Sequence, residues 1–281
     1  LHLDYPGHAM FFINHAGKRY GLYPIGSVAV HIPAYLLAKA LSAIPGAPRV
    51  ALMDFLPHVP ASLFAAGATV LFFVLLVRLR VGERAALLMT FGFAFCTILA
   101  IYARYPYSEA PQTFFLLLVF ERATTFRERP RVATAVGLGL AGGMLLNLKV
   151  LNIVPLLAVG VWLLVEARKM RPFPWKPLLA GAGSFTIGLG VTLWNNHVRT
   201  GSIFDTGYDN AVGHPVLSGS FLDGTLGLLF SPGKGLFFFS PLALLGLFGL
   251  PTLYRERRSW FWLMVAIVLA IMVPNFKYRV W

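Results

Sequence analysis

The chain has 281 residues, of which 57% are hydrophobic and only 12% charged. A soluble domain carries about 25% charged residues because water must wet its surface, so this composition excludes an ordinary soluble protein. The net charge of +13 does not indicate nucleic-acid binding, since the basic residues lie between apolar runs rather than on one polar face. The single cysteine, Cys96, excludes an intrachain disulfide. We therefore predict an integral membrane protein.

Apolar runs recur along the chain at about the 20-residue length that a membrane-spanning helix needs. We expect spans at about 60–78, 85–103, 109–126, 132–147, 150–167, 177–195, 237–254 and 259–275. The third is the weakest, because its apolar stretch is short and ends at Glu121 and Arg122. The predicted fold class is an all-α, polytopic transmembrane bundle of about eight spans.

Every second connection between these runs is short and basic, which is typical of the cytoplasmic side of a membrane protein. Fourteen of the 24 lysines and arginines lie there: Arg78, Arg80, Arg84, Arg122, Arg127, Arg129, Arg131, Arg168, Lys169, Arg171, Lys176, Arg255, Arg257 and Arg258. The long polar segments then face outward. This divides the chain into a first outer loop at 1–59, helices at 60–195, a long outer loop at 196–236 and two final helices at 237–281.

Within the first outer loop, segment 27–43 is apolar but carries His31, Pro33 and Lys39. It is predicted to be an interfacial helix that lies on the outer membrane surface, because a span here would move every later loop to the other side. The outward histidines have no metal-site spacing and are interpreted as structural or hydrogen-bonding groups. No local catalytic motif, such as a P-loop, a dinucleotide fingerprint or a paired-cysteine metal site, occurs in the chain.

Function is therefore sought in ionisable groups at the outer surface. Glu109 begins a predicted helix; it or Ser108 could simply cap that helix, or Glu109 could be a carboxylate at an active-site mouth. Lys149 lies in a tight outward turn, where it could extend to lipid headgroups or hold the phosphate of a lipid-linked substrate. Lys234, flanked by two glycines that would let backbone amides face a ligand, is a second candidate for phosphate. Arg199 is a candidate anion contact.

Three segments resemble a known family. The sequence GKRYGLYPIG at 17–26, the stretch from Asn196 to Tyr208, and the block from Phe230 to Pro241 are similar to outer loops of bacterial GT-C membrane glycosyltransferases. That group includes protein mannosyltransferases and aminoarabinose transferases of lipid A. The resemblance covers most of the chain.

The resemblance implies transfer of a sugar from a polyprenyl-phosphate donor to a lipid, glycan or protein acceptor on the outer face of the bacterial inner membrane. Glu109 matches the family's second acidic position and is the expected catalytic residue here, while Lys149 and Lys234 match basic positions that face the donor phosphate. Arg199, Tyr20, Tyr23 and Tyr208 are the other expected substrate contacts. The resemblance implies no specific cofactor, and a divalent metal is the one candidate.

The resemblance also implies that the chain is truncated at both ends. The family's main catalytic Asp follows its first span, so it is expected upstream of residue 1. Asp4 is the nearest acid in this sequence and does not suit that role.

Two other functions compete with the transferase. A lipid or amphiphile transporter or flippase predicts ionisable residues near the bilayer midplane and repeated half-structures, whereas the predicted spans here are nearly free of central charge. A scaffolding membrane subunit would not need long polar outer loops with clustered lysines, arginines and acids.

Overall fold

The computed structural model describes residues 11–13, 19–21, 23–209, 215, 217–233 and 235–277. Most of these residues are helical, and the all-α class is confirmed. Two short strands, β1 (Phe11–Ile13) and β2 (Arg19–Gly21), pair in an antiparallel hairpin in which Phe12 lies opposite Tyr20.

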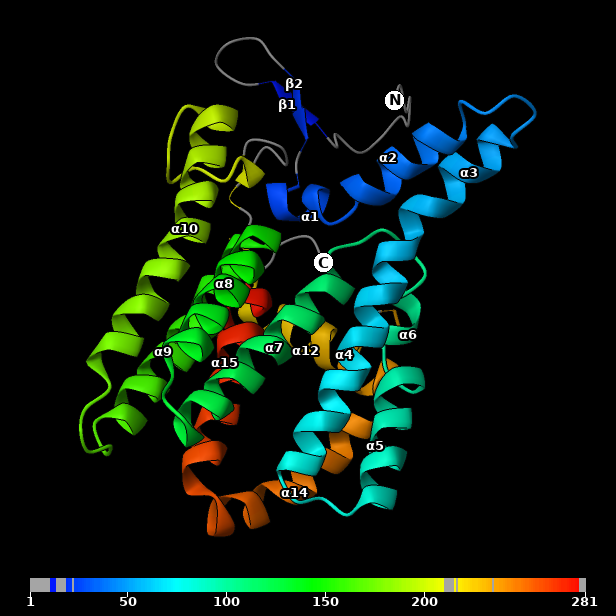
Figure 1. The fold of residues 1–281 in the computed structure, drawn as a ribbon. Coiled ribbons are helices and arrows are strands. Elements are labelled where there is room, and N and C mark those ends of the chain that lie inside the picture. Colours follow the sequence, from blue (N-terminus) through cyan, green and yellow to red (C-terminus); the bar gives the residue numbers. More distant parts are fainter. Residues whose placement is uncertain are drawn as a thin grey trace.

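The long helices form a bundle with their axes roughly parallel or antiparallel (Figure 1). They are α4 (Val59–Arg78), α5 (Glu83–Phe95), α7 (Glu109–Glu128), α8 (Val132–Leu148), α9 (Ile153–Ala167), α10 (Trp175–Thr200), α14 (Leu242–Glu256) and α15 (Arg258–Phe276). Each predicted apolar run therefore contains helix, because continuous apolar sequence with few helix breakers favours it.

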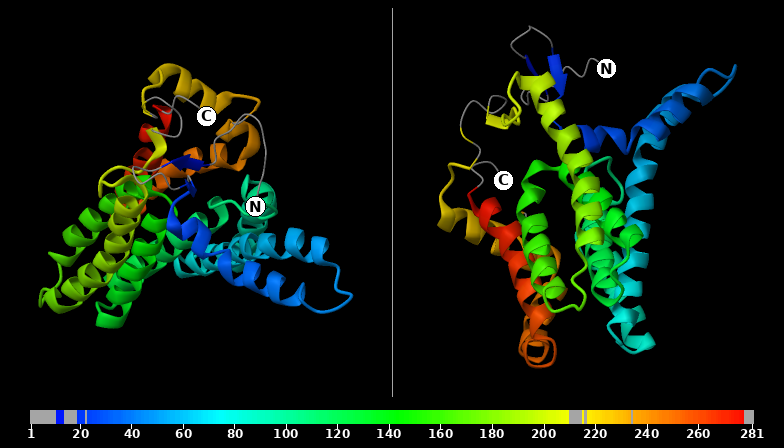
Figure 2. Two further views of the ribbon diagram at one scale, coloured as in Figure 1. Left: turned by 90° about the horizontal axis from the view of Figure 1, so that it is seen from above. Right: turned by 60° about the vertical axis from the view of Figure 1, so that its left-hand side comes forward.

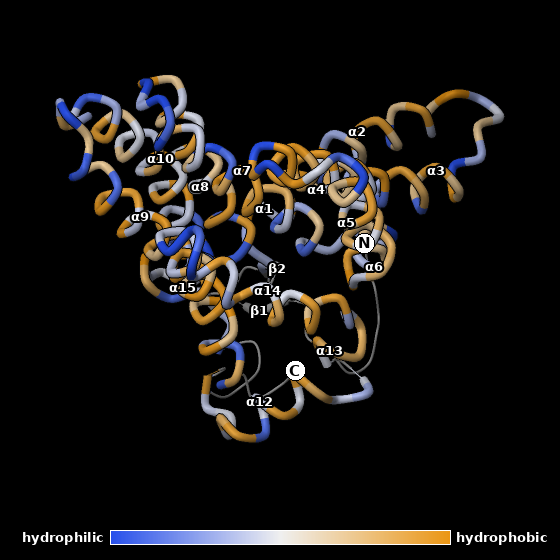
Figure 3. Tube along the Cα trace, turned by 90° about the horizontal axis from the view of Figure 1, so that it is seen from below, coloured by the Kyte–Doolittle hydropathy of each residue, from blue (hydrophilic) through white to orange (hydrophobic). Residues whose placement is uncertain are grey.

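Four helical segments are long and apolar enough to cross a membrane: 49–78, 150–167, 175–200 and 258–276. Their outer surfaces keep large apolar side chains exposed, such as Leu179 and Ile187 on α10, as expected for a protein surrounded by lipid. Along the trace, hydrophobic residues follow the helices and hydrophilic stretches gather in turns and at helix ends (Figure 3). The number of spans predicted from the sequence, about eight, is not confirmed.

Short helices cross one end of the bundle, which we call the site end. Helices α1 (Ile25–Ala29) and α2 (Ile32–Leu41) run across it, and α3 (Arg49–Phe55) returns beside α2 and leads through the 3-10 helix η1 (Leu56–His58) into α4 (Figures 1 and 2). Helices α2 and α3 form an arm that exposes Leu36, Val50 and Phe55. This arrangement suits the predicted interfacial helix, because an apolar face on a transverse helix can lie in a membrane surface.

Two of the predicted spans are interrupted. The run at 85–103 divides into α5 and the short α6 (Leu99–Tyr102), and the run at 237–254 divides into α13 (Leu236–Phe239) and α14. The two interruptions meet, since the Ile98 amide donates a 3.3 Å hydrogen bond to the Ser240 hydroxyl. Because an unwound turn frees backbone groups that need partners, contact between two such turns provides one.

The predicted loop at 196–236 starts later than expected and contains a helix. Helix α10 continues to Thr200 and ends at Gly201, whose φ of +83° favours glycine. Further along, α12 (Phe221–Phe230) is an apolar helix capped by Ser220, which accepts a hydrogen bond from the Asp223 amide. Polar residues at 195–199 suggested a loop, but they belong to the last turns of a long helix.

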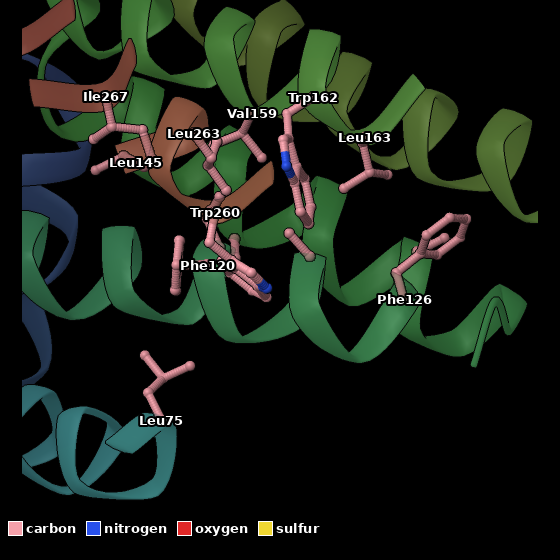
Figure 4. Packing of buried hydrophobic residues seen from close by; sticks show 14 residues of the cluster. Leu75, Phe120, Phe126, Leu145, Val159, Trp162, Leu163, Trp260, Leu263 and Ile267 are labelled. Carbon is pink, nitrogen blue, oxygen red and sulfur yellow. The ribbon is translucent and has the colours of Figure 1, made fainter. Parts of the chain in front are cut away.

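The main hydrophobic core lies where α7, α9 and α15 meet. Trp260 of α15 packs against Phe120 of α7 and Trp162 of α9, with ring centroids 5.1 and 5.3 Å apart (Figure 4). The indole of Trp162 also donates to the Ser259 hydroxyl at 2.9 Å. Aromatic burial with a satisfied indole N–H fixes how these helices sit against one another.

Helices α8 and α10 pack backbone against backbone. A Cβ placed on Gly188 of α10 would collide with the backbone of Gly143 on α8, so the two backbones touch directly. Asn147 joins the same pair, because its side-chain amide donates to the carbonyls of Gly143 and Gly188 at 2.8 and 2.9 Å. Small residues of this kind allow helices to pack closely in membranes, where dispersion contacts and interhelical hydrogen bonds replace the hydrophobic effect.

Replacing Gly188 with leucine should separate α8 from α10, because the new side chain has no room beside Gly143. We expect a loss of at least about 1–3 kcal/mol of stability, measured by thermal unfolding in detergent. Gly190→Leu is the matched control, since a Cβ at this neighbouring position on α10 meets no atom within 4 Å. Equal destabilisation by both variants would contradict the close contact.

Candidate functional site

The site end brings together two short turns. Lys149 is the residue between α8 and the 3-10 helix η2 (Val150–Asn152), and its backbone is extended, with φ −157° and ψ 121°. Its carbonyl accepts the Asn152 amide at 3.0 Å. Glu109 is the first residue of α7, ahead of the apolar stretch that begins at Phe114. Both predicted residues therefore lie at helix ends.

A hydrogen-bond chain ties these turns together. Asn152 donates to the Gln112 side-chain oxygen at 3.1 Å and to the Leu145 carbonyl at 2.9 Å. Gln112 in turn donates to the Ser108 hydroxyl at 2.8 Å. Ser108 stands at the N-cap of α7 but makes no capping hydrogen bond with its side chain. The chain fixes the start of α7 beside the turn that carries Lys149.

Glu109 and Lys149 lie close enough to affect each other's ionisation. Burial raises the pKa of the Glu109 carboxyl, and its own backbone N–H and the Lys149 ammonium oppose that shift. Burial lowers the pKa of the Lys149 ammonium, and Glu109 opposes that shift. Both groups are thus moved toward neutrality, which makes Glu109 a better base and Lys149 easier to deprotonate than the same groups in water.

Aromatic residues surround this pair. Tyr23 and Tyr102 both lie within electrostatic range of Glu109 and of Tyr107. Burial, more than these charges, raises the pKa of the Tyr23 hydroxyl, so it remains a neutral donor. The rings of Tyr102 and Tyr107 meet edge to face, with centroids 6.1 Å apart. The pair therefore lies among phenol groups that can hydrogen-bond a polyhydroxylated ligand.

His31 closes the side of the site formed by the arm. Its Nδ1 lies 3.0 Å from the Pro57 carbonyl, which joins the start of α2 to η1. Burial lowers the pKa of the imidazole, and His58 adds to that effect. This contact agrees with the interpretation of His31 as a structural, hydrogen-bonding group.

Helix α1, which begins two positions after Tyr23, packs against the end of α8. The Ser27 hydroxyl donates to the Leu148 carbonyl at 3.1 Å, next to Lys149. A Cβ on Gly26 would lie 2.5 Å from the Asn147 carbonyl carbon, so only glycine permits this approach. The end of α8 is therefore held between α1 and α10.

Arg199 lies apart from Glu109 and Lys149, in the last turn of α10. Its side chain is 4% exposed and donates to the Gly21 carbonyl on β2 at 2.9 Å. Asp205 and Tyr208 lie within its electrostatic range. Arg199 thus anchors the β-hairpin to α10, and this buried position suits a structural role as well as the predicted anion contact.

The remaining predicted contacts are distributed over two segments. Tyr20 lies on β2, three positions before Tyr23, and is partly buried. Lys234 falls outside the described residues. In its turn, the Gly235 amide donates to the Ser231 carbonyl at 2.7 Å and the Gly233 amide to the Ser231 hydroxyl at 3.2 Å. Both glycine amides are therefore hydrogen-bonded within the turn, and the role of Lys234 stays a prediction.

An apolar groove of about 490 Å³ lies beside the start of α7. Its walls are α2, the first turns of α4, and Phe114, which is five positions after Glu109 along α7; the lining residues are Val30, Pro33, Ala34, Leu37, Val59, Pro60, Leu63, Phe64 and Phe114. The groove is lined almost entirely by apolar side chains, which suits a hydrocarbon chain.

Among the described residues, no three His, Cys, Asp or Glu side chains lie close enough together to hold a metal ion. Comparison of the chain with family models, with curated proteins and with solved structures gave no match. The site is therefore interpreted from its own geometry.

The sequence predicted Glu109, Lys149 and Tyr23 but not the two other phenols near them, Tyr102 and Tyr107. Tyr107 lies two positions before Glu109, and Tyr102 lies seven positions before Glu109. The density of tyrosine immediately before a polar helix start was the available signal.

Replacing Glu109 with glutamine should lower the pKa of Lys149 further, because the carboxylate is the group that raises it. The Lys149 amine should then react with an acylating reagent at lower pH than in the wild-type protein. The measurement is the pH profile of labelling at Lys149, followed by peptide mass spectrometry. Lys39, exposed on α2, is the internal control and should keep its profile. Superimposable Lys149 profiles would show that the two groups do not interact.

Proposed function

We propose that the protein is an integral membrane glycosyltransferase that moves a sugar from a polyprenyl-phosphate donor to a lipid, glycan or protein acceptor. The observation that carries the proposal is the pairing of Glu109 with Lys149 in a tyrosine-lined site next to an apolar groove. The proposed roles of the two residues follow the resemblance of the outer segments to GT-C enzymes. No nucleic-acid partner and no resident cofactor enters the proposal.

In this proposal, Glu109 removes the proton from the acceptor hydroxyl or amine. A carboxylate with a raised pKa is suited to accept a proton near neutral pH. Lys149 stabilises the negative charge that develops on the departing lipid phosphate, as a fixed cation does for an oxyanion. Tyr23, Tyr102 and Tyr107 hydrogen-bond the sugar, and the prenyl chain occupies the groove beside Phe114.

The site end then faces outward and the opposite end faces the cytoplasm of a bacterial inner membrane. The basic turns between α4 and α5, α7 and α8, α9 and α10, and α14 and α15 support this orientation. The apolar stretches of α5, of α7 after Thr113, of α8 and of α14 join the four long apolar segments as spans. Residues 1–59 and 196–236 contribute the outward surface.

The test is transfer activity of the full-length protein in liposomes that contain polyprenyl-phosphate sugars. Glu109→Gln should reduce transfer roughly 10²- to 10⁴-fold, the usual contribution of a general base. Lys149→Gln should reduce it roughly 10²- to 10³-fold, as for one oxyanion-stabilising group. If both variants retain full activity, the assignment of the site is wrong.

Two exposed residues on the arm at the same end serve as controls for the change of charge. Asp54→Asn on α3 repeats the loss of a carboxylate, and Lys39→Gln on α2 repeats the loss of an ammonium. Both should retain transfer, since neither residue lines the groove.

A lipid or amphiphile flippase is the second candidate. It is favoured by the two interrupted helices, α5/α6 and α13/α14, whose breaks meet at Ile98 and Ser240. Discontinuous helices often form substrate sites in transporters. The same liposomes distinguish the two functions: lipid movement without a new glycosidic bond supports the flippase, and bond formation supports the transferase.

A further inference from the structure

The end of the bundle opposite the site end contains a second polar centre, which the proposed function does not use. A cleft of about 170 Å³ opens between the ends of α4 and α7 and the junction of α14 with α15. Its polar and aromatic lining is Arg78, Thr124, Arg127, Glu128, Arg257 and Trp260. We call it the arginine cleft.

The three arginines come from separate parts of the chain and are held by different contacts. Arg78 donates to Glu121 at 3.0 Å and to Thr125 at 2.5 Å. Arg127 pairs through Nε with the buried Glu166 at 2.8 Å. Arg257 donates to the Leu79 carbonyl at 3.3 Å. The enrichment of lysine and arginine in cytoplasmic turns explains why arginines are frequent here. It does not explain why three of them line one cleft.

These contacts leave donors available at the lining of the cleft. Arg127 uses Nε for Glu166, and its two Nη atoms donate no hydrogen bond within the part of the chain that the structure describes. Its guanidinium carbon lies 5.8 Å from the centroid of the Trp260 ring, a cation–π contact at the wall of the cleft. An arginine fork with free Nη donors matches the oxygens of a phosphate group.

The charge balance of the lining favours an anion. The lining holds three guanidinium groups and one carboxylate, Glu128, whose side chain is 56% exposed and lies 4.0 Å from Arg78 Nε. Glu121 and Glu166, outside the lining, pair with Arg78 and Arg127, whereas Arg257 makes no ion pair among the described residues and supplies the positive charge in excess. Ligand pockets for drug-sized molecules enclose about 300–1,000 Å³, so the arginine cleft suits a single ionic group rather than a larger organic ligand.

We propose that the arginine cleft binds a phosphate group, presented by the headgroup of an acidic phospholipid. Trp260 and Trp162 lie at the adjoining end of the core, and tryptophan is enriched at the level of lipid headgroups. Basic pockets between membrane helices are suited to acidic headgroups, and a zwitterionic headgroup would add a positive charge to an already basic cleft. This inference does not depend on the transferase proposal.

The experiment is a titration of the purified full chain in a neutral detergent, with bound lipid counted by native mass spectrometry. Phosphatidylglycerol should bind more tightly than phosphatidylcholine. The double variant Arg127→Gln/Arg257→Gln should weaken phosphatidylglycerol binding roughly 30-fold, since each basic group near an acidic lipid contributes about fivefold. The control Arg129→Gln/Arg131→Gln makes the same charge change at exposed positions in the neighbouring turn and should bind almost as the wild type does.

Each alternative outcome is decisive. Equal weakening by the two double variants would overturn the site, because binding would then follow overall charge. Equal protection against thermal unfolding by inorganic phosphate and by phosphatidylglycerol would overturn the lipid assignment and leave a small phosphate as the ligand. If the double variant does not fold, Arg257→Gln alone tests the cleft, because Arg257 donates only to the Leu79 carbonyl among the described hydrogen bonds.

Discussion

The close approach of α8 to α10 is the constraint on which the site end depends. Because Gly143 and Gly188 bring the two backbones into contact, Asn147 can bridge them with both of its amide hydrogen bonds. The end of α8 is then fixed, and Ser27 docks α1 onto it. Lys149 follows directly, so its position beside Glu109 results from packing that begins a full turn earlier in α8.

The two ends of the bundle use charge in different ways. At the end with the arginine cleft, Glu166 is 5% exposed and joins three elements through Arg127, Lys169 and Ser259. Such a network holds helices in register, although a buried ion pair contributes little net stability. At the site end, burial raises the pKa of Glu109 and lowers that of Lys149. Such shifts suit a catalytic role more than a structural one.

The local pattern of apolar and basic residues predicted where the helices lie, because apolar runs and basic turns are properties of neighbouring residues. The sequence also indicated Glu109 and Lys149 separately, but their proximity arises from contacts such as Asn152 with Gln112, 40 positions apart. Contacts between distant segments also produced the arginine cleft and the meeting of Ile98 with Ser240. The polar residues at the end of α10 favour a loop locally, but contacts such as that of Arg199 with Gly21 stabilise helix there.

The connection between α8 and η2 is a single extended residue, Lys149. An added residue at this point would lengthen the extended connection by about 3.3–3.6 Å. That displacement would move Asn152 away from Gln112 and Leu145, and with it the start of the helix that carries Val159 and Trp162 into the core. The length of this connection is therefore as constrained as its chemistry, and insertions should be tolerated in the outer segments but not here.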